Sequence, residues 1–496
     1  MLNLTAQLLY HARVRPHAEA LIHGEARLDW ATLAARVQRL AGGLRARGIG
    51  PDSIVGMVMK NSSAFIELLY AISHVGAVSL PMNFRLSGEE IGFIAGHAGV
   101  DLVIADIEFA DAVRGLDAPV VMLDPAAQGD PGRVLGGDRV LAPYPRAGAD
   151  LMRLMYTSGT TDRPKGVTHS YHNVHYKNLD MILSLQLTAR DRLCMVGPLY
   201  HVGACDLPGM AVHVVGGTLV VLRDFDAQAV VETIAREAVT GIWLAPVMTS
   251  GILALERGAL PDLSSLRWCI AGGDRTPESR IRDFGSVFPN ARYVDAYGMT
   301  ETVSGDTMME PGREIEKIGS VGRPVSMVEL EIRDDTGAAL PAGVAGEICM
   351  RGPKVTRGYW KDPGRTAAAM FADGFLRSGD MGYLDDDGFL YLTDRKKDMI
   401  ISGGENIASS EVERVIFMMP QVEDVAVIAR PDEKWGEVPV AVIVLKAGHT
   451  LTLEELRVFC RSHLAGFKCP ADMRLVDVLP RNPSGKILKR LLRDAS

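Results

Sequence analysis

Apolar and polar positions alternate along the first third of the chain in a way that predicts short buried strands separated by helices. Strands are expected at 54–58, 77–80, 102–105 and 120–123, with a helix at 64–75 between the first two. An earlier helix is expected to begin after Asp29, which is a suitable N-cap residue. Strands that alternate with helices predict a wound α/β sheet.

The same alternation continues after residue 150 and then gives way to a different pattern. Further strands are expected at 151–156, 193–196, 218–222, 242–245, 266–271 and 292–296, with helices from about 170 and at 228–237. From about residue 318 the pattern is that of β-strands joined by turns, including a hairpin turn at 385–388. The last hundred residues carry their own helices, at 410–417 and 453–463, and strands, at 425–428 and 440–444.

We therefore expect an α/β protein with two domains. The larger, residues 1–396, consists of wound sheets plus a β-rich subdomain. The smaller, residues 397–496, has the size of a mobile α+β lid domain.

One polar stretch follows the apolar strand 151–156 directly. It combines hydroxyl side chains, a glycine and a cation, in Thr157, Ser158, Gly159, Thr160, Thr161 and Lys165. Amides, hydroxyls and a cation after a strand are how a chain holds a polyphosphate. The stretch is not a Walker A loop, because Lys165 is followed by Gly166. An ordinary polar loop is the alternative.

Other chemically distinctive residues fall where predicted strands end. These positions are 198–201, 272–274 and 295–301, and ligands in open α/β sheets bind beyond the carboxyl ends of strands. Thr300 offers a hydroxyl to a phosphate, and Glu301 offers a carboxylate to Mg²⁺. Further along, Asp380 lies on a tight turn and suits a ribose diol, and Arg395 suits ribose or phosphate. Taken singly, these residues also fit a solvated loop acid, a turn former and surface cations.

Composition narrows the class of protein. Of 496 residues, 47% are hydrophobic and 23% charged, which is typical of a globular protein. A net charge of −8 without a basic block excludes nucleic acid as an expected partner. No signal peptide or transmembrane segment is predicted, and six scattered cysteines indicate reduced thiols. We expect a cytoplasmic protein that acts on a small molecule, and a homodimer is an open possibility.

In this order and spacing, the motifs from Tyr156 to Lys486 resemble the AMP-forming acyl-activating superfamily, which includes acyl-CoA synthetases, adenylation domains and firefly-type luciferases. The resemblance covers essentially the whole chain. It implies ATP, Mg²⁺ and coenzyme A as cofactors, and a ligase that converts a carboxylic acid to acyl-AMP with release of pyrophosphate and then to acyl-CoA.

The resemblance also implies roles for individual residues. The loop 157–165 would hold the β- and γ-phosphates, Thr160 and Glu301 would face magnesium, and Thr300 would touch the α-phosphate. Lys486 would bridge the acyl carboxylate and the α-phosphate. The adenosine would lie against a set of residues shared between two parts of the chain: Gly272, Gly273, Asp295, Tyr297, Gly298, Asp380 and Arg395.

In the family the C-terminal domain rotates between the two half-reactions, and the matching hinge is Lys397. The rotation would bring the glycines Gly403 and Gly404 to the acyl group. Coenzyme A would meet Trp435, Phe467, Lys468 and Arg85. Relatives often carry more cations after this lysine, whereas Cys469 and Ala471 stand here.

The acid is expected to be fatty or aromatic. Amino-acid-activating relatives place an aspartate near the position of His201, and none is present at that point. The predicted acyl pocket is mainly apolar and includes His201, Val202, Trp243, Met299 and Val303. Two alternatives remain at this level: an enzyme that loads an acyl carrier protein, and a non-catalytic nucleotide-binding protein.

Two residues depart from the family pattern, and one group of histidines suggests a metal site. Asp162 and Asp274 occupy positions where relatives usually carry glycine and a small or apolar residue, respectively. His169, His172 and His175 suggest a metal site, but steps of three do not converge on a helix, so a solvated helix start is the better interpretation.

Overall fold

The computed structural model describes residues 3–124, 130–157, 164–272, 278–395, 398–402, 405–432, 434–481 and 487–494. The chain divides into two compact units. The first comprises Met1–Glu329 and Met350–Leu376, and the second comprises Leu330–Cys349 and Arg377–Ser496. The predicted domain boundary at 396/397 falls on residues outside the described part and stays a prediction.

Within its described residues, the first unit contains a nine-stranded and a six-stranded sheet. In spatial order, the nine-stranded sheet consists of β15 (Arg323–Pro324), β14 (Thr307–Met308), β13 (Arg292–Tyr297), β12 (Trp268–Gly272), β11 (Gly241–Leu244), β9 (Arg192–Met195), β10 (Thr218–Val221), β1 (Glu19–His23) and β2 (Ala26–Asp29). The six-stranded sheet consists of β6 (Val120–Leu123), β5 (Leu102–Asp106), β3 (Ile54–Val58), β4 (Val78–Pro81), β7 (Leu151–Thr157) and β8 (Lys165–Ser170).

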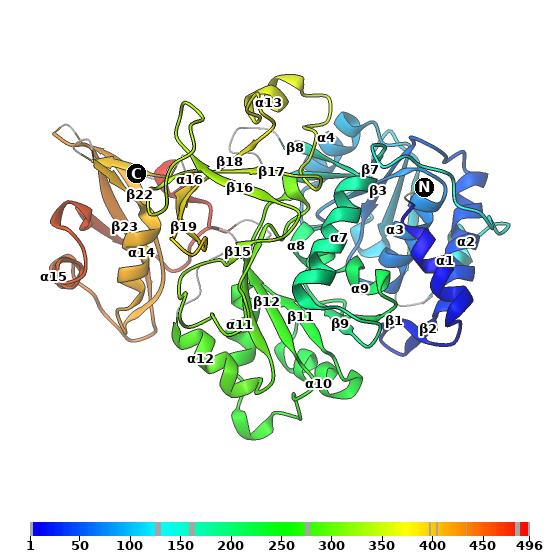
Figure 1. Cartoon of the computed structure of the whole chain (residues 1–496), viewed down its shortest axis with the longest axis horizontal. Helices are drawn as coiled ribbons and strands as arrows, with labels where there is room; N and C mark the ends of the chain where they lie inside the picture. Colours follow the sequence, from blue (N-terminus) through cyan, green and yellow to red (C-terminus); the bar gives the residue numbers. More distant parts are fainter. Residues whose placement is uncertain are drawn as a thin grey trace. The chain divides into compact units, whose positions relative to one another are not determined.

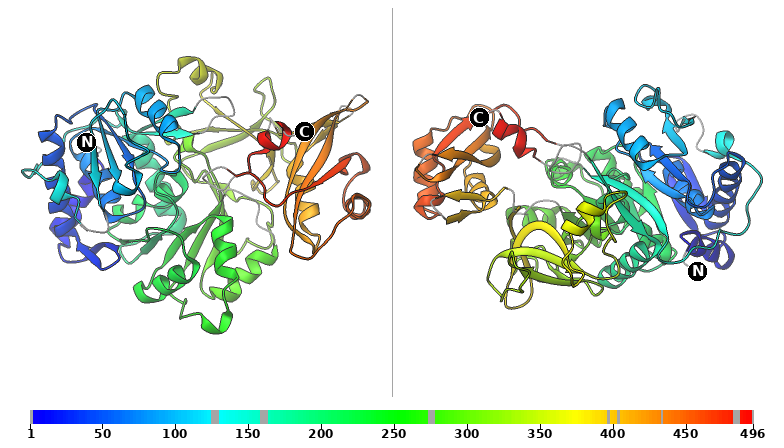
Figure 2. Two further views of the ribbon diagram at one scale, coloured as in Figure 1. Left: turned by 180° about the vertical axis from the view of Figure 1, so that it is seen from behind. Right: turned by 90° about the horizontal axis from the view of Figure 1, so that it is seen from above.

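The helices of this unit cover the sheets. They are α1 (Thr5–Val14), α2 (Trp30–Ala46), α3 (Ser63–His74), α4 (Gly88–Ala98), η1 (Ile107–Phe109), α6 (Gly132–Leu135), α7 (Tyr171–Leu185), α8 (Val202–Asp206), α9 (Met210–Val214), α10 (Ala227–Glu237), α11 (Pro246–Leu253), η2 (Arg257–Ala259), α12 (Glu278–Val287), η3 (Thr300–Thr302) and α13 (Pro363–Ala368). Figure 1 shows α10, α11 and α12 along the strands β11 and β12, and both views of Figure 2 show α1 and α2, in dark blue, side by side.

The observed elements match the expected alternation closely in this unit. Asp29 caps α2 by accepting a hydrogen bond from the Thr32 amide. The strands β3 and β6 have the predicted bounds, and the others begin or end within two residues of them. Apolar side chains of β9, β11 and β12 pack against α10 and α12 in a core that includes Cys194, Ile242 and Phe284. This packing is the wound α/β arrangement.

Several strands of this unit were not predicted, namely β1, β2, β8, β14 and β15, and β8 is the one next to the predicted phosphate loop. Residues Lys165–Ser170 form β8, which pairs antiparallel with β7. The expected helix begins only after Ser170, which caps α7 through a capping box with Asn173. The phosphate-loop stretch therefore lies between two strands of a hairpin.

The second unit contains a β-rich sheet and a smaller α+β part. The four-stranded sheet is formed by β16 (Glu329–Arg333), β17 (Gly346–Arg351), β18 (Leu376–Leu384) and β19 (Leu390–Arg395). The predicted hairpin turn joins β18 to β19, with the Gly388 amide donating to the Asp385 carbonyl.

The α+β part follows from residue 400. Its elements are β20 (Ile400–Ser402), β21 (Glu405–Ile407), α14 (Ser409–Phe417), β22 (Val422–Asp432), β23 (Gly436–Leu445), α15 (Leu453–Arg461), η4 (Gly466–Lys468), β24 (Asp472–Leu475) and α16 (Lys489–Asp494). Val412 and Ile416 of α14 pack on Val425 and Val427 of β22 in a core of their own.

Strand order explains why the distinctive residues gather. The strands β13, β12, β11 and β9 are neighbours and parallel. Their carboxyl ends therefore lie at one edge of the sheet, where Gly272 ends β12 and where the segments after β9 and β13 carry His201 and Thr300. The described part of the chain has no helix with both the length and the apolar character needed to cross a membrane.

Candidate active site

The phosphate-loop hairpin presents one buried hydroxyl that has no hydrogen-bond partner among the residues that the structure describes. Thr157 ends β7 and pairs in register with Lys165, the first residue of β8. Its Oγ1 is buried and forms no hydrogen bond with any residue that the structure describes. Because buried hydroxyls are normally satisfied, this oxygen fits a ligand group. Ser158, Gly159, Thr160, Thr161 and Asp162 lie outside the described residues.

Lys165 is bound to a carboxylate that lies far away in sequence. Its Nζ donates to Glu301 Oε1 at 2.6 Å and to the Tyr359 hydroxyl at 2.8 Å. The Tyr359 hydroxyl itself donates to the same Glu301 oxygen at 2.8 Å. Burial, followed by the adjacent Glu301 charge, raises the pKa of Tyr359 well above its usual range, so the hydroxyl keeps its proton. The three side chains form a closed triangle of hydrogen bonds.

Glu301 is suited to a hard cation. Its side chain is buried, and both Lys165 and Tyr359 engage the same oxygen, Oε1. Within the described part of the chain, no donor hydrogen-bonds the other oxygen, Oε2. A carboxylate with one uncommitted oxygen beside a phosphate-binding hairpin fits Mg²⁺, which is usually bound through one or two carboxylates plus phosphate oxygens.

The backbone around Glu301 is fixed from two directions. The His169 Nε2 atom lies 2.7 Å from the Thr300 carbonyl oxygen, and the Thr356 amide donates to the Glu301 carbonyl at 2.7 Å. The interpretation of His169 as part of a solvated helix start was wrong, because His169 lies on β8 and is fully buried. Burial, with a further contribution from the Arg153 charge, lowers the pKa of His169 to about 3.

The predicted adenine-binding residues lie on two neighbouring strands. Gly272 ends β12 and faces Ala296 of β13, one residue after Asp295 in the register. Asp295 and Tyr297 are both buried. Gly298 follows, and a methyl group there would lie 2.3 Å from the Gly305 amide nitrogen, so this turn excludes any side chain. Gly273 and Asp274 lie outside the described residues.

The predicted acyl-pocket residues His201 and Trp243 are brought together. Their rings are 6.5 Å apart and tilted by 32°. The Trp243 indole lies against two glycines, because a methyl group at Gly197 or Gly203 would approach it to 2.6 Å or 3.1 Å. His201 caps α8 by accepting the Gly203 amide, and burial lowers its pKa. The glycines thus leave room for the indole ring.

Val202 and Val303 belong to one buried cluster with Met155 and Val174. Val303 has a left-handed backbone with φ of 58°, which is costly for a β-branched residue. Such outliers persist where the surroundings impose them, and this one follows Glu301 by two residues. Met299 precedes the same turn and is the N-cap residue of η3.

In the second unit, the two predicted ribose-binding residues are opposite each other. Asp380 of β18 and Arg395 of β19 are register partners in the antiparallel pair. The Asp380 amide donates to Ser378 Oγ at 3.0 Å. The predicted tight turn at Asp380 was wrong, because Asp380 lies within strand β18. Lys397, Gly403, Gly404 and Lys486 lie outside the described residues, so their roles stay predictions.

Four of the predicted coenzyme A residues, Trp435, Phe467, Lys468 and Arg85, contact neighbouring side chains; Lys468 is half-buried and the other three are exposed. The Trp435 ring faces the Lys434 ammonium at 4.7 Å, and Lys468 lies 5.8 Å from the centre of the Phe467 ring. Lys468 also donates to both oxygens of Glu411, at 2.9 and 2.7 Å. In the first unit, the Arg85 guanidinium lies 5.5 Å from the Phe84 ring centre.

Sequence reasoning missed Tyr359, Thr356 and Arg153. Tyr359 and Thr356 reach Glu301 from a segment 55 to 58 positions away, which no local pattern reveals. Arg153 had a visible signal, because it is a charged residue inside the apolar run 151–156. All six cysteines are free thiols, as predicted.

Comparison with known proteins agrees with this geometry. The sequence matches the AMP-binding enzyme family over residues 8–360 and the C-terminal domain of AMP-binding enzymes over 411–486. It is 38% identical to feruloyl-CoA synthase from Amycolatopsis sp., over 97% of this chain and 96% of that protein. It is 34% identical to the long-chain-fatty-acid–CoA ligase FadD13 from Mycobacterium tuberculosis, over 100% and 98%.

The fold is shared with o-succinylbenzoate CoA synthetase (MenE) from Bacillus subtilis. The structure of that enzyme with its acyl-adenylate intermediate OSB-AMP superposes with a TM-score of 0.90 at 31% identity, covering 99% of this chain and 98% of that one. Its complex with ATP and magnesium gives 0.88 at 30% identity, with 98% of each chain covered. The chain therefore belongs to the AMP-binding enzyme family and is an AMP-forming acyl-CoA ligase.

Proposed function

We propose that this ligase uses ATP, Mg²⁺ and coenzyme A to convert an aryl or fatty acid without an α-amine into its CoA thioester. The observation that carries the proposal is the triangle of Lys165, Glu301 and Tyr359, next to the buried Thr157 hydroxyl, which has no hydrogen-bond partner in the described part of the chain. In this triangle the Lys165 ammonium, which suits a phosphate, and the Glu301 carboxylate, which suits a metal ion, neutralise each other. When nucleotide and metal bind, the phosphate becomes the partner of Lys165 and the metal becomes the partner of Glu301. The magnesium complex of MenE supports the assignment of the metal.

In the first half-reaction, an oxygen of the substrate carboxylate attacks the α-phosphorus of ATP, and the bond to pyrophosphate breaks. Thr157 and Lys165 hold the terminal phosphates, and the Thr300 hydroxyl donates to an α-phosphate oxygen. When bound at Glu301, magnesium neutralises charge on the phosphate oxygens. Asp380 and Arg395 bind the ribose, while Asp295 and Tyr297 lie against the adenine.

In the second half-reaction, the thiolate of coenzyme A attacks the acyl carbon, and AMP leaves with the electron pair of the broken carbon–oxygen bond. Lys397 is the proposed hinge for a rotation that withdraws Lys486 and presents Gly403 and Gly404. Trp435, Phe467, Lys468 and Arg85 are the proposed contacts of the coenzyme.

Among acids, we favour an aromatic one. Trp243 and His201 form an aromatic wall, and planar rings pack well against such surfaces in offset or edge-on arrangements. The feruloyl-CoA synthase relative supports the same class. Six free cysteines favour the reducing cytoplasm. A homodimer stays a prediction that sedimentation of the purified protein tests.

The test is a panel of cinnamic, benzoic and C6–C16 alkyl acids, scored by pyrophosphate release with and without coenzyme A. We expect release with an aromatic acid and conversion to the thioester when coenzyme A is added. Acyl-AMP that accumulates at saturating coenzyme A, but is consumed with an acyl carrier protein, would instead identify a carrier-loading enzyme. No acid-dependent exchange of pyrophosphate into ATP would contradict the function.

The role of Lys486 separates the two half-reactions. We expect Lys486→Ala to lower adenylate formation about 100-fold or more, because it removes a preorganised donor from the developing charge. Thiolysis of supplied acyl-AMP should be spared, since that step follows withdrawal of the lysine. Both rates are measured on the same preparation, and equal loss of both contradicts the assignment.

A further inference from the structure

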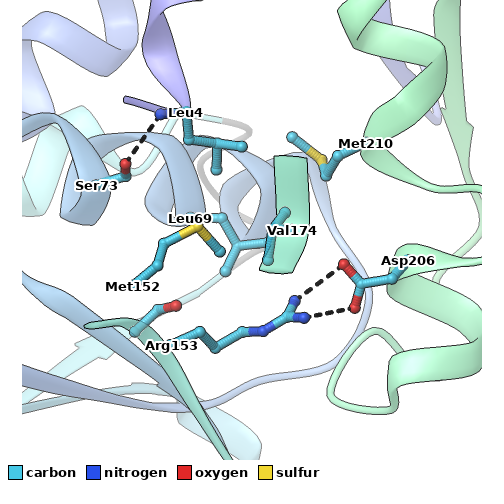
Figure 3. A pocket seen from close by; sticks show the side chains of 9 residues that line it. Leu4, Leu69, Ser73, Met152, Arg153, Val174, Asp206 and Met210 are labelled. Atoms are coloured by element: carbon cyan, nitrogen blue, oxygen red, sulfur yellow. Dashed lines mark hydrogen bonds and ion pairs between the residues drawn. The ribbon is translucent and has the colours of Figure 1, made fainter. Parts of the chain in front are cut away.

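A buried arginine lies inside the strand that leads to the phosphate loop. Arg153 of β7 is almost fully buried, and its guanidinium forms a two-pronged ion pair with Asp206 of α8, with Nη1–Oδ1 and Nη2–Oδ2 distances of 3.2 and 2.8 Å. Figure 3 shows the pair beside a cavity lined by Leu69, Met152 and Val174. Apolar surroundings strengthen such a pair and make either partner costly to leave alone.

The same guanidinium also orients a histidine. Arg153 Nε and Nη2 lie 3.2 and 3.1 Å from His169 Nδ1. A guanidinium only donates hydrogen bonds, so His169 Nδ1 accepts and the ring proton resides on Nε2. His169 Nε2–H therefore donates to the Thr300 carbonyl oxygen, which lies 2.7 Å from Nε2. His169 is therefore a neutral connector with a fixed tautomer.

His169 contacts the backbone of the short turn that carries Thr300 and Glu301, the residues proposed to bind the α-phosphate and the metal. Thr300 and Glu301 lie on η3, a single short turn with few hydrogen bonds of its own. The Thr300 carbonyl is held by His169, and the Glu301 carbonyl is held by Thr356. Thr356 Oγ1 donates in turn to the carbonyl of Thr168, the neighbour of His169 on β8. Strand β8 therefore contacts the Thr300 carbonyl directly through His169 and the Glu301 carbonyl indirectly through Thr356.

We propose that Asp206, Arg153 and His169 form a positioning relay that holds Thr300 and Glu301 in register with the phosphate-loop hairpin. The relay joins β7 and β8 of the six-stranded sheet to η3, which follows β13 of the nine-stranded sheet. The inference rests on the proposed roles of Thr300 and Glu301. None of the three relay residues touches a reacting atom, so each is a positioning residue.

Three substitutions of His169 separate its two contacts. His169→Gln retains an oxygen to accept from Arg153 and an amide to donate to Thr300. His169→Asn retains an oxygen that can accept from Arg153 but is too short to donate to the Thr300 carbonyl. His169→Leu loses both hydrogen bonds. The matched control is His213→Leu on α9. His213 is also fully buried, with Tyr70 at 2.8 Å from Nδ1 and the Ala20 carbonyl at 2.8 Å from Nε2, and these partners have no assigned role in the site.

Two readouts are needed, and one is independent of turnover. The first is the affinity for Mn²⁺·ATP, measured by electron paramagnetic resonance in the absence of acid and coenzyme A. The second is the kcat and KM of acid-dependent pyrophosphate exchange. Thermal unfolding of every variant reports the purely structural cost.

We expect His169→Leu and His169→Asn to weaken Mn²⁺·ATP binding about tenfold and to lower exchange about 100-fold, as small misplacements of catalytic groups do. His169→Gln should restore both to within about threefold of wild type. His213→Leu should lower the unfolding temperature without changing Mn²⁺·ATP affinity.

Two results would overturn the relay. One is Mn²⁺·ATP affinity at the wild-type level in both His169→Leu and His169→Asn. The other is an equal loss of affinity in His213→Leu. Wild-type protein without acid-dependent exchange would contradict the proposed function instead, so the two failures are distinguishable.

Discussion

Each of the two units contains a lysine–glutamate ion pair whose lysine is proposed to contact a phosphate group. The two pairs differ in how deeply the glutamate is buried. Lys165 binds Glu301 at 2.6 Å in the first unit, and Lys468 binds Glu411 at 2.7 Å in the second. The two lysine side chains are equally exposed, at 25% and 24%, whereas the glutamates are 4% and 31% exposed. The two pairs have the same chemical groups, but the carboxylate is buried in the first pair and partly exposed in the second.

Burial changes what the pair does. Glu301 is held by Tyr359 and by hydrogen bonds to its own and the preceding carbonyl, so its carboxylate has a fixed position before any ligand binds. Glu411 lies in the first turn of α14, where water competes for it. Exposed pairs of this kind contribute about 0–1 kcal/mol. The Lys165–Glu301 pair is therefore preorganised. In the other pair, Glu411 competes only weakly with a coenzyme phosphate for Lys468.

The largest effect is expected from Glu301→Gln. The substitution keeps the shape of the side chain but removes the negative charge that pairs with Lys165 and that we propose binds the metal. Acid-dependent pyrophosphate exchange should fall about 100-fold or more, the scale of a lost preorganised charge. The matched control is Glu411→Gln, which should leave exchange unchanged. Similar losses in both variants would mean that burial does not distinguish the pairs.

A smaller effect is expected from Tyr359→Phe. The variant keeps the ring beneath Lys165, whose Nζ lies 4.4 Å from the ring centre, and removes only the hydroxyl. Loss of one hydrogen bond to a charged group should weaken Mn²⁺·ATP binding about tenfold. Electron paramagnetic resonance titration measures this. Binding unchanged from wild type would show that Lys165 alone positions Glu301.

In the second unit, Lys468→Ala should raise the KM for coenzyme A about threefold to fivefold, since an exposed ion pair with phosphate is weak. Exchange in the absence of coenzyme A should not change, because the first half-reaction does not use this residue. Steady-state kinetics with varied coenzyme A give the answer. A change confined to kcat would argue against a phosphate contact.

The smallest effect, of opposite sign, is expected from Glu411→Gln. Releasing Lys468 from its neighbour should lower the KM for coenzyme A about twofold, and more at low ionic strength where screening is weak. The KM for coenzyme A is measured for Glu411→Gln and Lys468→Ala at the same salt concentrations. A raised KM in Glu411→Gln would mean that the glutamate orients the lysine rather than competes with the coenzyme.

The sequence by itself determined many of the strands and helices and the family of the protein. Asp29 capped the expected helix, β3 and β6 had the expected bounds, and the turn at 385–388 formed. Cap residues, apolar periodicity and turn chemistry act over a few neighbours, so a local pattern suffices to predict them. The family motifs likewise singled out Thr300, Glu301 and Lys165 as candidate site residues, and their roles stay predictions.

Only the tertiary structure decided which groups meet. It placed His169 on an unpredicted strand, where Arg153 and the Thr300 carbonyl satisfy it. It also delivered Tyr359 to Glu301 across 58 positions. The physical reason is that a buried polar group must find a partner wherever the sheet topology brings one, and sequence spacing carries no record of that topology.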